Sequence, residues 1–494
     1  MELQRYEKNQ YQHNKNEKKT LRTCKKKYHM TELERLYEAY TASRRVTTDS
    51  RAITPGCIFF AFKGEHFDGN AFAPQALAQG AALCVVSDGH YKVDDRCIVV
   101  PDVLKTLQEL AHEHRRHLDI PVVGITGTNG KTTTKELVHA VLAKRYRTSA
   151  TRGNFNNHLG VPLTLLSIPE GTELAIVEMG ANHPGEIETL CGIAAPTCGL
   201  ITNVGRAHLE GFGSFEGVVQ TKTELYRYLA GNHGLVFVNA DNQRLMHEAE
   251  RLATIPGLRS FIPAYAPDNP AFVPATIDKT PLSMLTYGRS QESDVRGSLS
   301  SHQSHHLRFY FEVGDNVYNV QTHLLGDYNF DNCMAAVAVG LHFGVEPWDI
   351  KEAIEEYVPS NQRSEFRETP RGNSLYLDCY NANPSSMEAA IGSFSQLPPF
   401  ASHLKMAIIG GMHELGHEEQ REHQRVVELL AGCHLDRVFL VGPEWDGLAL
   451  KDNMQCFPDT EALRLHLQSH PLTAATILVK GSNTNRLWTL EEQL

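Results

Sequence analysis

Residues 121–142 read PVVGITGTNGKTTTKELVHAVL, and this stretch decides the fold of the 494-residue chain. A short apolar, β-branched run meets a turn that contains Gly127 and Gly130, and an apolar pattern of helical spacing follows. This order predicts a strand, a phosphate-binding loop and a helix. Backbone N–H groups of the loop and of the helix start would bind an anion. Lys131 would reach the outer phosphates of a nucleotide, and the Thr132 hydroxyl could bind Mg²⁺.

The spacing of this loop differs from the commonest pattern. That pattern requires a glycine five positions before Gly130, where the chain has Ile125, with Gly124 one place earlier. The alternative interpretation is an ordinary turn with a lysine in solvent. The flanking strand and helix favour nucleotide binding.

The composition describes a globular protein and argues against several functional classes. Hydrophobic residues make up 41% and charged residues 21%, and no apolar run approaches the roughly 20 residues of a membrane span. The ten cysteines form no CxxC pair, and Cys84, Cys97 and Cys379 lie in apolar runs, which is typical of reduced cysteines in the cytoplasm. The net charge of -11 argues against a surface that coats nucleic acid. We expect a cytoplasmic protein with no membrane span and no nucleic-acid partner.

Strand-like and helix-like segments alternate along most of the chain, which predicts an α/β fold. At this length about three domains are expected. Residues 1–29 hold nine Lys or Arg against three acids and predict a disordered basic arm, with attraction to RNA or to an anionic membrane surface as the alternative. The expected domains are a small α/β domain at 30–118, a central domain with the phosphate loop and a mostly parallel sheet at 119–358, and a Rossmann-like α/β domain at 359–494.

Polar residues follow the strands that are predicted in the central domain. Glu178 ends the run LAIVE, and His208 follows the run GLITNV. Because ligands bind outside the carboxyl ends of parallel strands, both side chains are expected near the phosphate loop, and Glu178 is a candidate Mg²⁺ ligand. The alternatives are a carboxylate paired with a lysine and a hydrogen-bonded loop histidine. Lys222 lies on a predicted helix, and by itself it would be interpreted as a solvent lysine.

Two polar loops are further candidates for ligand binding. Residues 151–166, TRGNFNNHLGVPLTLL, combine an amide-rich loop with a following apolar helix. The amide side chains could bind a polar ligand, although asparagine and glycine also form turns. Residues 48–51, TDSR, could bind an anion through Arg51 and the hydroxyls, or could simply form a loop. Two later passages, 263–274 and 290–306, are predicted to be loops, and His302, His305 and His306 of the second are predicted to lie at the surface.

The string HELGH at 413–417 matches HExxH, the helical signature of zinc proteases, in which two histidines share one helix face and the glutamate acts as a base. Here the string follows the apolar run AIIGGM and contains Gly416, so a turn after a strand is predicted instead of a helix. A chain with 25 histidines can also match such a motif by chance. Zinc proteolysis is therefore the disfavoured alternative.

Several of these segments together resemble one family, the ATP-dependent Mur ligases of peptidoglycan precursor synthesis. The general resemblance rests on GTNGKTTT, on Glu178 in EMG, on His208 in NVGRAHLEGFGS, on Lys222 in KTEL and on Asn329 in GDYNFDN. DSRAITPG, GNFNNHLGVPLTLL, EMGANHPGEI, DCYNANPSSM and GGMHELG are similar to segments of the branch that adds D-alanyl-D-alanine to UDP-N-acetylmuramoyl-tripeptide. The resemblance extends from Asp49 into the carboxyl-terminal domain. It includes GMHELG, so it implies no zinc.

The resemblance implies three domains, one for the UDP-sugar, one for ATP and a carboxyl-terminal one that closes over both. It implies ATP contacts by Gly127, Thr128, Asn129, Gly130, Lys131, Thr132, Thr133, Asn329, Arg363 and Asp378. It implies Mg²⁺ ligation by Thr132, Glu178, His208 and Lys222, the last carbamylated by CO₂. It implies contacts to the UDP-muramoyl peptide by Ser50, Arg51 and Asn157, and a position facing the incoming dipeptide for Asn381 and Asn383. Lys131, Lys222 and His208 would be the catalytic residues.

The activity that the resemblance implies is amide formation through an acyl phosphate, carried out by a cytoplasmic monomer that supplies precursors for the cell wall, cell shape and cell division. A P-loop ATPase whose other domains bind a protein partner is one alternative. Another Mur ligase or a folylpolyglutamate-type ligase is the other. The chain departs from the family pattern at Gln362, where a glycine is expected before Arg363, and at Cys379, where serine usually follows Asp378.

Overall fold

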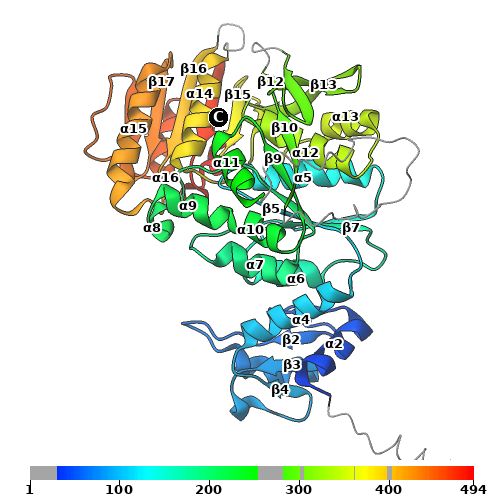
Figure 1. Cartoon of the computed structure of the whole chain (residues 1–494). Helices are drawn as coiled ribbons and strands as arrows, with labels where there is room; N and C mark the ends of the chain where they lie inside the picture. Colours follow the sequence, from blue (N-terminus) through cyan, green and yellow to red (C-terminus); the bar gives the residue numbers. More distant parts are fainter. Residues whose placement is uncertain (1–29, 254–281, 301–304, 361, 398–402) are drawn as a thin grey trace, which may run out of the picture. The chain divides into compact units, whose positions relative to one another are not determined.

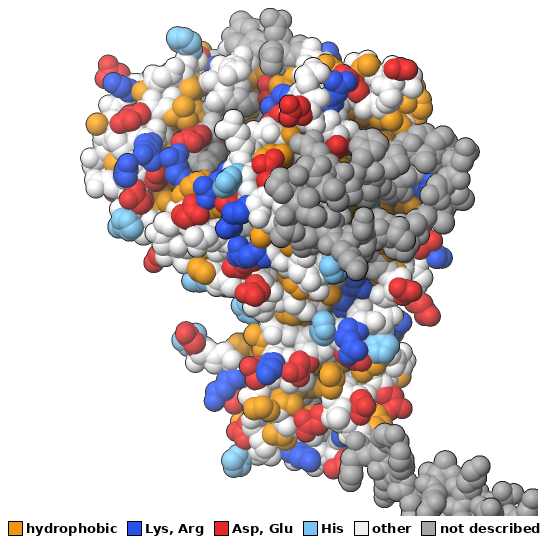
Figure 2. Space-filling model, viewed as in Figure 1, with side chains coloured by type: hydrophobic (Ala, Val, Ile, Leu, Met, Phe, Trp, Pro, Cys, Tyr) orange, Lys and Arg blue, Asp and Glu red, His pale blue; other side chains and the backbone are white. Residues whose placement is uncertain are grey.

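The computed structural model describes residues 30–253, 282–300, 305–360, 362–397 and 403–494 (Figure 1). The arm predicted at 1–29 and the loop predicted at 263–274 lie outside these residues. The chain divides into two compact units, Met1–Glu113 and His114–Leu494. Both units combine helices with largely parallel sheets, which confirms the predicted α/β class. Acidic and basic side chains are interspersed over the face that Figure 2 shows.

The first unit is organised around a parallel sheet of four strands in the order β1-β2-β3-β4. The strands are β1 Val46–Thr47, β2 Ile58–Phe60, β3 Leu83–Val86 and β4 Cys97–Val99, and the helices are α2 Glu32–Ser43, η1 Gly69–Phe72, α3 Ala73–Ala78, η2 Gly89–Tyr91 and α4 Val103–His117. The hydroxyl of Thr31 accepts the N–H of Glu34 at 3.2 Å, and the Glu34 carboxylate accepts the N–H of Thr31 at 2.7 Å. This reciprocal cap fixes the start of α2.

The second unit contains a nine-stranded sheet in the order β13-β12-β11-β10-β9-β8-β5-β7-β6. Neighbouring strands are parallel from β6 to β11, and the pairs β11–β12 and β12–β13 are antiparallel. The strands are β5 Val122–Thr126, β6 Thr148–Ala150, β7 Leu174–Glu178, β8 Cys198–Ile201, β9 Leu235–Asn239, β10 Ser283–Gly288, β11 Val295–Leu299, β12 His306–Val313 and β13 Asn316–Leu325. The helices are α5 Lys131–Ala143, α6 Gly160–Leu166, α7 Glu186–Ala194, α8 Leu209–Phe212, α9 Phe215–Lys222, α10 Glu224–Gly231, α11 Gln243–Leu252, α12 Asn329–His342 and α13 Pro347–Glu356.

The same unit contains a second sheet of six strands in the order β14-β15-β19-β16-β17-β18, parallel except for β14. The strands are β14 Glu365–Glu368, β15 Ser374–Asp378, β16 Leu404–Gly410, β17 Arg437–Val441, β18 Met454–Phe457 and β19 Ala475–Lys480. The helices are α14 Pro384–Gln396, η3 Gly416–Glu418, α15 Glu419–Gly432, η4 Pro443–Trp445, α16 Thr460–Ser469, η5 Asn483–Asn485 and η6 Leu487–Leu490. This part, the C-terminal domain below, has the Rossmann-like alternation that the sequence predicts.

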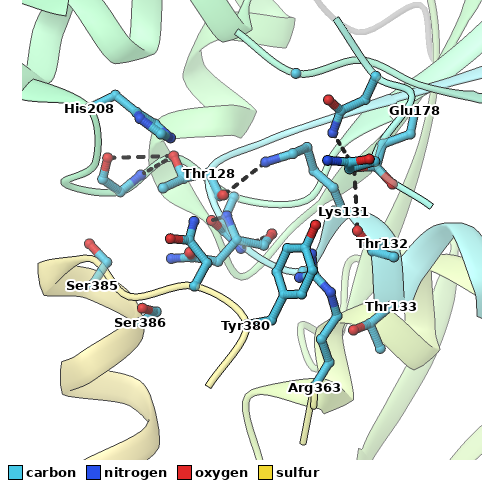
Figure 3. A pocket seen from close by; sticks show the side chains of 18 of the residues that line it. Thr128, Lys131, Thr132, Thr133, Glu178, His208, Arg363, Tyr380, Ser385 and Ser386 are labelled. Atoms are coloured by element: carbon cyan, nitrogen blue, oxygen red, sulfur yellow. Dashed lines mark hydrogen bonds between the residues drawn. The ribbon is translucent and has the colours of Figure 1, made fainter. Parts of the chain in front are cut away.

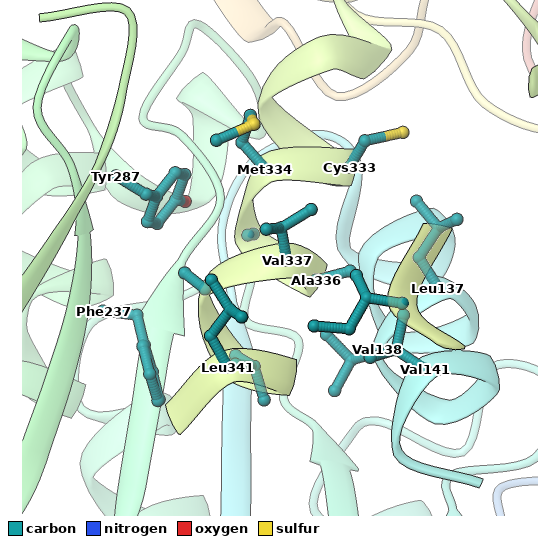
Figure 4. Packing of buried hydrophobic residues seen from close by; sticks show 14 of the residues in the cluster. Leu137, Val138, Val141, Phe237, Tyr287, Cys333, Met334, Ala336, Val337 and Leu341 are labelled. Carbon is teal, nitrogen blue, oxygen red and sulfur yellow. The ribbon is translucent and has the colours of Figure 1, made fainter. Parts of the chain in front are cut away.

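The helix that follows the phosphate loop is held in place by the core. Leu137, Val138 and Val141 of α5 pack against the small-residue face of α12 (Figure 4). The two helices approach closely because α12 has a glycine at the contact: a Cβ on Gly340 would lie 2.5 Å from Cγ1 of Val141. The start of α5 is therefore fixed by buried packing about two to three turns further along the helix.

The passage 290–306, predicted to be a loop, contains the strand β11. The prediction was wrong because the passage is mostly polar, whereas β11 is stabilised by pairing with β10 on one side and β12 on the other. His305 and His306 are also not simple surface residues. The His305 ring hydrogen-bonds the Tyr376 hydroxyl, and the His306 ring meets Phe366 edge-on at 5.6 Å. His302 lies outside the described residues.

Candidate active site

A cavity of about 770 Å³ lies where β5, β7 and β8 end, and the start of α14 in the C-terminal domain also lines it (Figure 3). Residues predicted from the sequence line much of it: Thr128, Asn129, Gly130, Lys131, Thr132, Thr133, Asn157, Glu178, His208, Asn329, Arg363, Asp378 and Asn381. The strand ends that the sequence placed near the phosphate loop therefore do meet there.

The loop between β5 and α5 has the conformation that its glycines permit. Gly127 has φ +144° and Gly130 has φ +77°. A Cβ on Gly127 would lie 2.0 Å from Oγ1 of Thr202, and one on Gly130 would lie 2.5 Å from Oδ1 of Asn332. Both positions thus require glycine for backbone conformation and for space. The loop leads directly into the first turn of α5, whose N–H groups and dipole favour an anion.

Lys131 lies half-buried at the start of α5. Its Nζ donates to the carbonyl oxygens of Gly127 at 2.7 Å and Thr128 at 3.0 Å. Loss of hydration lowers the pKa of Lys131 to about 8, an effect that Glu178 opposes and Arg363 reinforces. The ammonium is therefore hydrogen-bonded to loop carbonyls, and a bound phosphate could replace these carbonyls as its partner.

Glu178 ends β7 and is almost fully buried. Its Oε1 accepts the amide of Asn156 at 2.7 Å and the hydroxyl of Thr132 at 3.4 Å. Its Oε2 is buried and has no hydrogen-bond partner among the described residues, and Nζ of the buried Lys135 lies 3.9 Å from it. A hydroxyl beside a carboxylate oxygen with spare capacity fits Mg²⁺, which commonly binds one or two carboxylates together with substrate phosphates. Among the described residues no group of three or more His, Cys, Asp or Glu could hold a metal ion, so such a site would depend on ligand oxygens.

His208 lines the cavity beside the loop, and its Nδ1 pairs with Oε2 of Glu414 from the C-terminal domain. Burial lowers the pKa of His208, and the Glu414 carboxylate opposes this effect. Lys222, at the end of α9, is 2% exposed, and its Nζ donates to the carbonyl of Ala181 at 3.2 Å. Burial lowers the pKa of Lys222 well below its ordinary value, and Lys131 adds to the effect. The interpretation of Lys222 as a solvent lysine is therefore wrong.

The C-terminal domain supplies the opposite wall. The Arg363 guanidinium lies 3.7 Å over the ring of Tyr380, and Lys480 pairs with Asp378 at 2.8 Å. Gln362, at the position where the family pattern has glycine, adopts φ +55°, the left-handed conformation that glycine favours. A glutamine in this conformation stores backbone strain that a glycine would not.

Some predicted residues lie beside the lining or elsewhere. Gly127 and Lys222 are not among the described residues that line it. Asn383 caps α14 and exchanges side-chain hydrogen bonds with Asn129 at 2.7 and 3.4 Å. Ser50 and Arg51 belong to the first unit, where Arg51 pairs with Asp49 at 2.8 Å, and their role stays a prediction.

The cavity also has lining residues that the sequence reasoning did not single out. They include Asn154, Asn156, His158, Asn182 and Glu186 of the central domain, and Tyr380, Ser385, Ser386 and Lys480 of the C-terminal domain. The amide-rich loop and the segment DCYNANPSS were the signals that could have found many of them.

The HELGH string forms a loop after β16 that leads into the 3-10 helix η3, as predicted. Its three polar side chains have different partners: His413 lies 3.5 Å from Glu444, Glu414 meets His208, and His417 lies 3.5 Å from Glu418. The two histidines do not share a helix face, so the zinc-protease interpretation is excluded by the geometry.

The fold and the site together define a P-loop nucleotide-binding protein whose phosphate loop faces a second, Rossmann-like domain. Three domain families match the chain: "Mur ligase family, catalytic domain" at 44–117, "Mur ligase middle domain" at 125–255 and "Mur ligase, glutamate ligase domain" at 362–483. The UDP-N-acetylmuramoyl-tripeptide--D-alanyl-D-alanine ligase of Bacillus subtilis is 34% identical over 81% of this chain and 80% of its own length. The Escherichia coli enzyme of that name is 34% identical over 89% of this chain and 91% of its own length. The chain belongs to the Mur ligase family.

Solved structures of Mur ligases share the fold of this chain. MurF from Acinetobacter baumannii superposes with a TM-score of 0.76 at 28% identity, covering 90% of this chain and 92% of its own. The MurF ligase from Thermotoga maritima in complex with ADP gives 0.77 at 26% identity, covering 94% and 98%. The chain is thus a ligase with the three-domain Mur fold. Within the described residues, no helix combines the length and apolarity needed to cross a membrane.

Proposed function

We propose that the chain joins D-alanyl-D-alanine to UDP-N-acetylmuramoyl-tripeptide with ATP as the energy source. The observation that carries this proposal is the cavity in which a phosphate loop with Lys131 faces Asp378, Asn381 and Lys480 of the C-terminal domain. The names of the relatives support the same substrates. The alternative, a P-loop ATPase with a protein partner, is disfavoured because relatives named as D-alanyl-D-alanine ligases of this kind match along most of the chain.

The residues present suggest how amide formation would proceed. The loop N–H groups and the Lys131 ammonium would hold the γ-phosphate in line with the terminal carboxylate of the tripeptide, which attacks the phosphorus. ADP would leave, and the amine of D-alanyl-D-alanine would displace phosphate from the acyl phosphate. The C-terminal wall would keep water away from this intermediate.

Thr132 and Glu178 fit a Mg²⁺ ion, and His208 would be a further ligand. When bound, the ion would neutralise charge on the transferring phosphate. Lys222 would act as a carbamate: its amine, whose pKa is lowered by burial, would add to CO₂ and release a proton, which turns a buried cation into a carboxylate. Such a carboxylate could bind a second Mg²⁺.

The remaining assignments divide the cavity between substrates. Asn329, Arg363 and Asp378 would contact the nucleotide together with residues 127–133. Asn157 would contact the UDP-muramoyl peptide, and Asn381 and Asn383 would face the dipeptide. Ser50 and Arg51, which belong to the first unit, are proposed as further contacts to the UDP-muramoyl peptide. The enzyme would act as a monomer in the cytoplasm.

Phosphate release from ATP tests the proposal. We expect release by the purified chain only when both UDP-N-acetylmuramoyl-tripeptide and D-alanyl-D-alanine are present, together with the amide product by mass spectrometry. Tripeptides with lysine or diaminopimelate as third residue would define the natural donor. Phosphate release that is the same with and without the two substrates would overturn the proposal in favour of an ATPase.

We expect Lys131 to take up a proton when a nucleotide binds. The pKa of Lys131 in the free protein is about 8, and ADP phosphates placed beside its ammonium would raise it. At pH 8.5 the lysine would therefore be largely neutral before binding and charged after it. Calorimetry of ADP binding in buffers of different ionisation enthalpy should show net proton uptake at pH 8.5, less at pH 7, and less again in Lys131→Met.

A further inference from the structure

The glutamate of the HELGH string reaches the other domain. We propose that Glu414 is a positioning residue for His208, and that its carboxylate holds Nδ1 of the ring so that Nε2 keeps its lone pair for the metal and phosphate side of the cavity. The inference rests on the proposed function, because it assigns His208 as a metal ligand. It makes the metal site of the central domain depend on contact with the C-terminal domain.

Two contacts join the loop at 411–418 to the segment of His208. The side chains of Glu414 and His208 pair directly. The N–H of Glu210 also donates to the carbonyl of Glu414 at 3.4 Å, and a Cβ on Gly416 would lie 3.4 Å from Cβ of Glu210. The backbone contact does not involve the Glu414 side chain, so a side-chain variant would leave the docking of the loop in place.

Both paired residues have strained backbones. His208 has φ +50° and Glu414 has φ +60°. In this left-handed region asparagine, aspartate and histidine are more frequent than other residues that carry a Cβ, whereas glutamate seldom adopts it. Each such residue costs of order 1 kcal/mol or more, and strain of this kind concentrates at functional sites. Here the two strained residues face each other across the domain boundary.

The loop is anchored on its own domain. The N–H of Met412 donates to Nε2 of the buried His423 at 3.0 Å, and the Ser482 hydroxyl donates to the carbonyl of Gly411 at 2.8 Å. His413 lies 3.5 Å from the Glu444 carboxylate. The loop that carries Glu414 is therefore held in place by its own domain. The ring of His208 packs edge-on against Phe212, with 6.2 Å between the ring centres.

The consequence concerns which ring nitrogen carries the proton. A carboxylate at Nδ1 stabilises the Nδ1–H form and leaves Nε2 as an acceptor, the arrangement by which carboxylates commonly orient metal-binding histidines. Loss of such an outer partner typically lowers metal affinity or activity by about 10- to 100-fold.

The test compares Glu414→Gln and Glu414→Asn with wild type and with the control Glu418→Gln. Asparagine tolerates the left-handed backbone, so Glu414→Asn removes the charge without adding strain. Glu418 lies in the same loop and pairs with Arg421 and His417. The binding readout uses Mn²⁺ with the β,γ-methylene analogue of ATP, and pulsed electron paramagnetic resonance to detect a directly bound imidazole nitrogen. The kinetic readout is kcat and KM of amide formation.

We expect nitrogen coupling in wild type and in Glu418→Gln, no such coupling in His208→Asn, and weakened coupling in both Glu414 variants, with kcat lowered about 10- to 100-fold. Coupling and kcat at wild-type levels in both Glu414 variants would overturn the inference, as would wild-type protein without nitrogen coupling. Failure of the proposed function is separate: it would appear as absence of amide product in wild type, whatever the resonance spectra show.

Discussion

Lys222→Ala is expected to abolish most amide formation while nucleotide binding is retained. Lys222 is 2% exposed as a residue, and its ammonium donates to one carbonyl in the described structure at 3.2 Å and lies 5.3 Å from the centre of the Phe212 ring. An unmodified lysine ammonium in this environment is costly, and burial accordingly lowers the pKa of Lys222 well below its ordinary value. A free amine there can add to CO₂, whereas a solvent lysine would be protonated. Without the carbamate, we expect kcat to fall by roughly a hundredfold or more.

The carbamate assignment is tested by chemical rescue. A small carboxylate such as formate or acetate should partly restore turnover in Lys222→Ala, where truncation leaves room for it, and less in Lys222→Met, which fills the space without an acid. Wild type with the same salt is the control for ionic strength. Normal turnover in the unrescued alanine variant would refute the carbamate role, and ADP affinity by calorimetry would show that the loop is intact.

Much of the fold was predictable because local sequence patterns, such as glycine turns and apolar runs, indicate its strands and helices. The loop at 127–133 lies between a strand and a helix as its glycines and apolar flanks indicated, and Glu178 lies at the end of β7. The rule that parallel strands gather ligands at their carboxyl ends then placed Glu178 and His208 in one cavity. The polar passage that contains β11 was missed because pairing with neighbouring strands, not its own sequence, makes it a strand.

The contacts within the site that the sequence did not predict join distant segments. Glu414 pairs with His208 across 206 positions of sequence, and Asn383 pairs with Asn129 across 254. No periodicity or spacing reports such a contact. The burial of Lys222 is a similar case, since its helix by itself gives no sign that the side chain is buried.

Lys131→Met is expected to lower kcat by about 10²- to 10³-fold, with a smaller effect on KM for the peptide donor. Methionine has a similar length but cannot donate to the γ-phosphate, and charge stabilisation in the transition state is the largest single contribution of such a group. The matched control is Lys144→Met at the end of the same helix, whose ammonium pairs with Glu352 and Glu356 instead. Wild-type kcat in Lys131→Met would exclude Lys131 from phosphoryl transfer.

The same substitution should not destabilise the fold at neutral pH. The pKa of Lys131 is about 8 in the folded protein against an ordinary value of 10.5, so the folded state holds the proton less tightly than the unfolded chain. Below pH 8 the full penalty of the charged form opposes folding, and between about pH 8 and 10.5 stability gains as the ammonium loses its proton. Lys131→Met removes this penalty, and we expect a thermal midpoint at pH 7 equal to or above that of wild type, with the difference narrowing above pH 8. A lower midpoint at pH 7 would mean that the hydrogen bonds from Nζ to Gly127 and Thr128 outweigh the desolvation of the charge. A loss of kcat together with a retained or raised midpoint is the expected result for a lysine whose burial serves phosphate binding at the expense of stability.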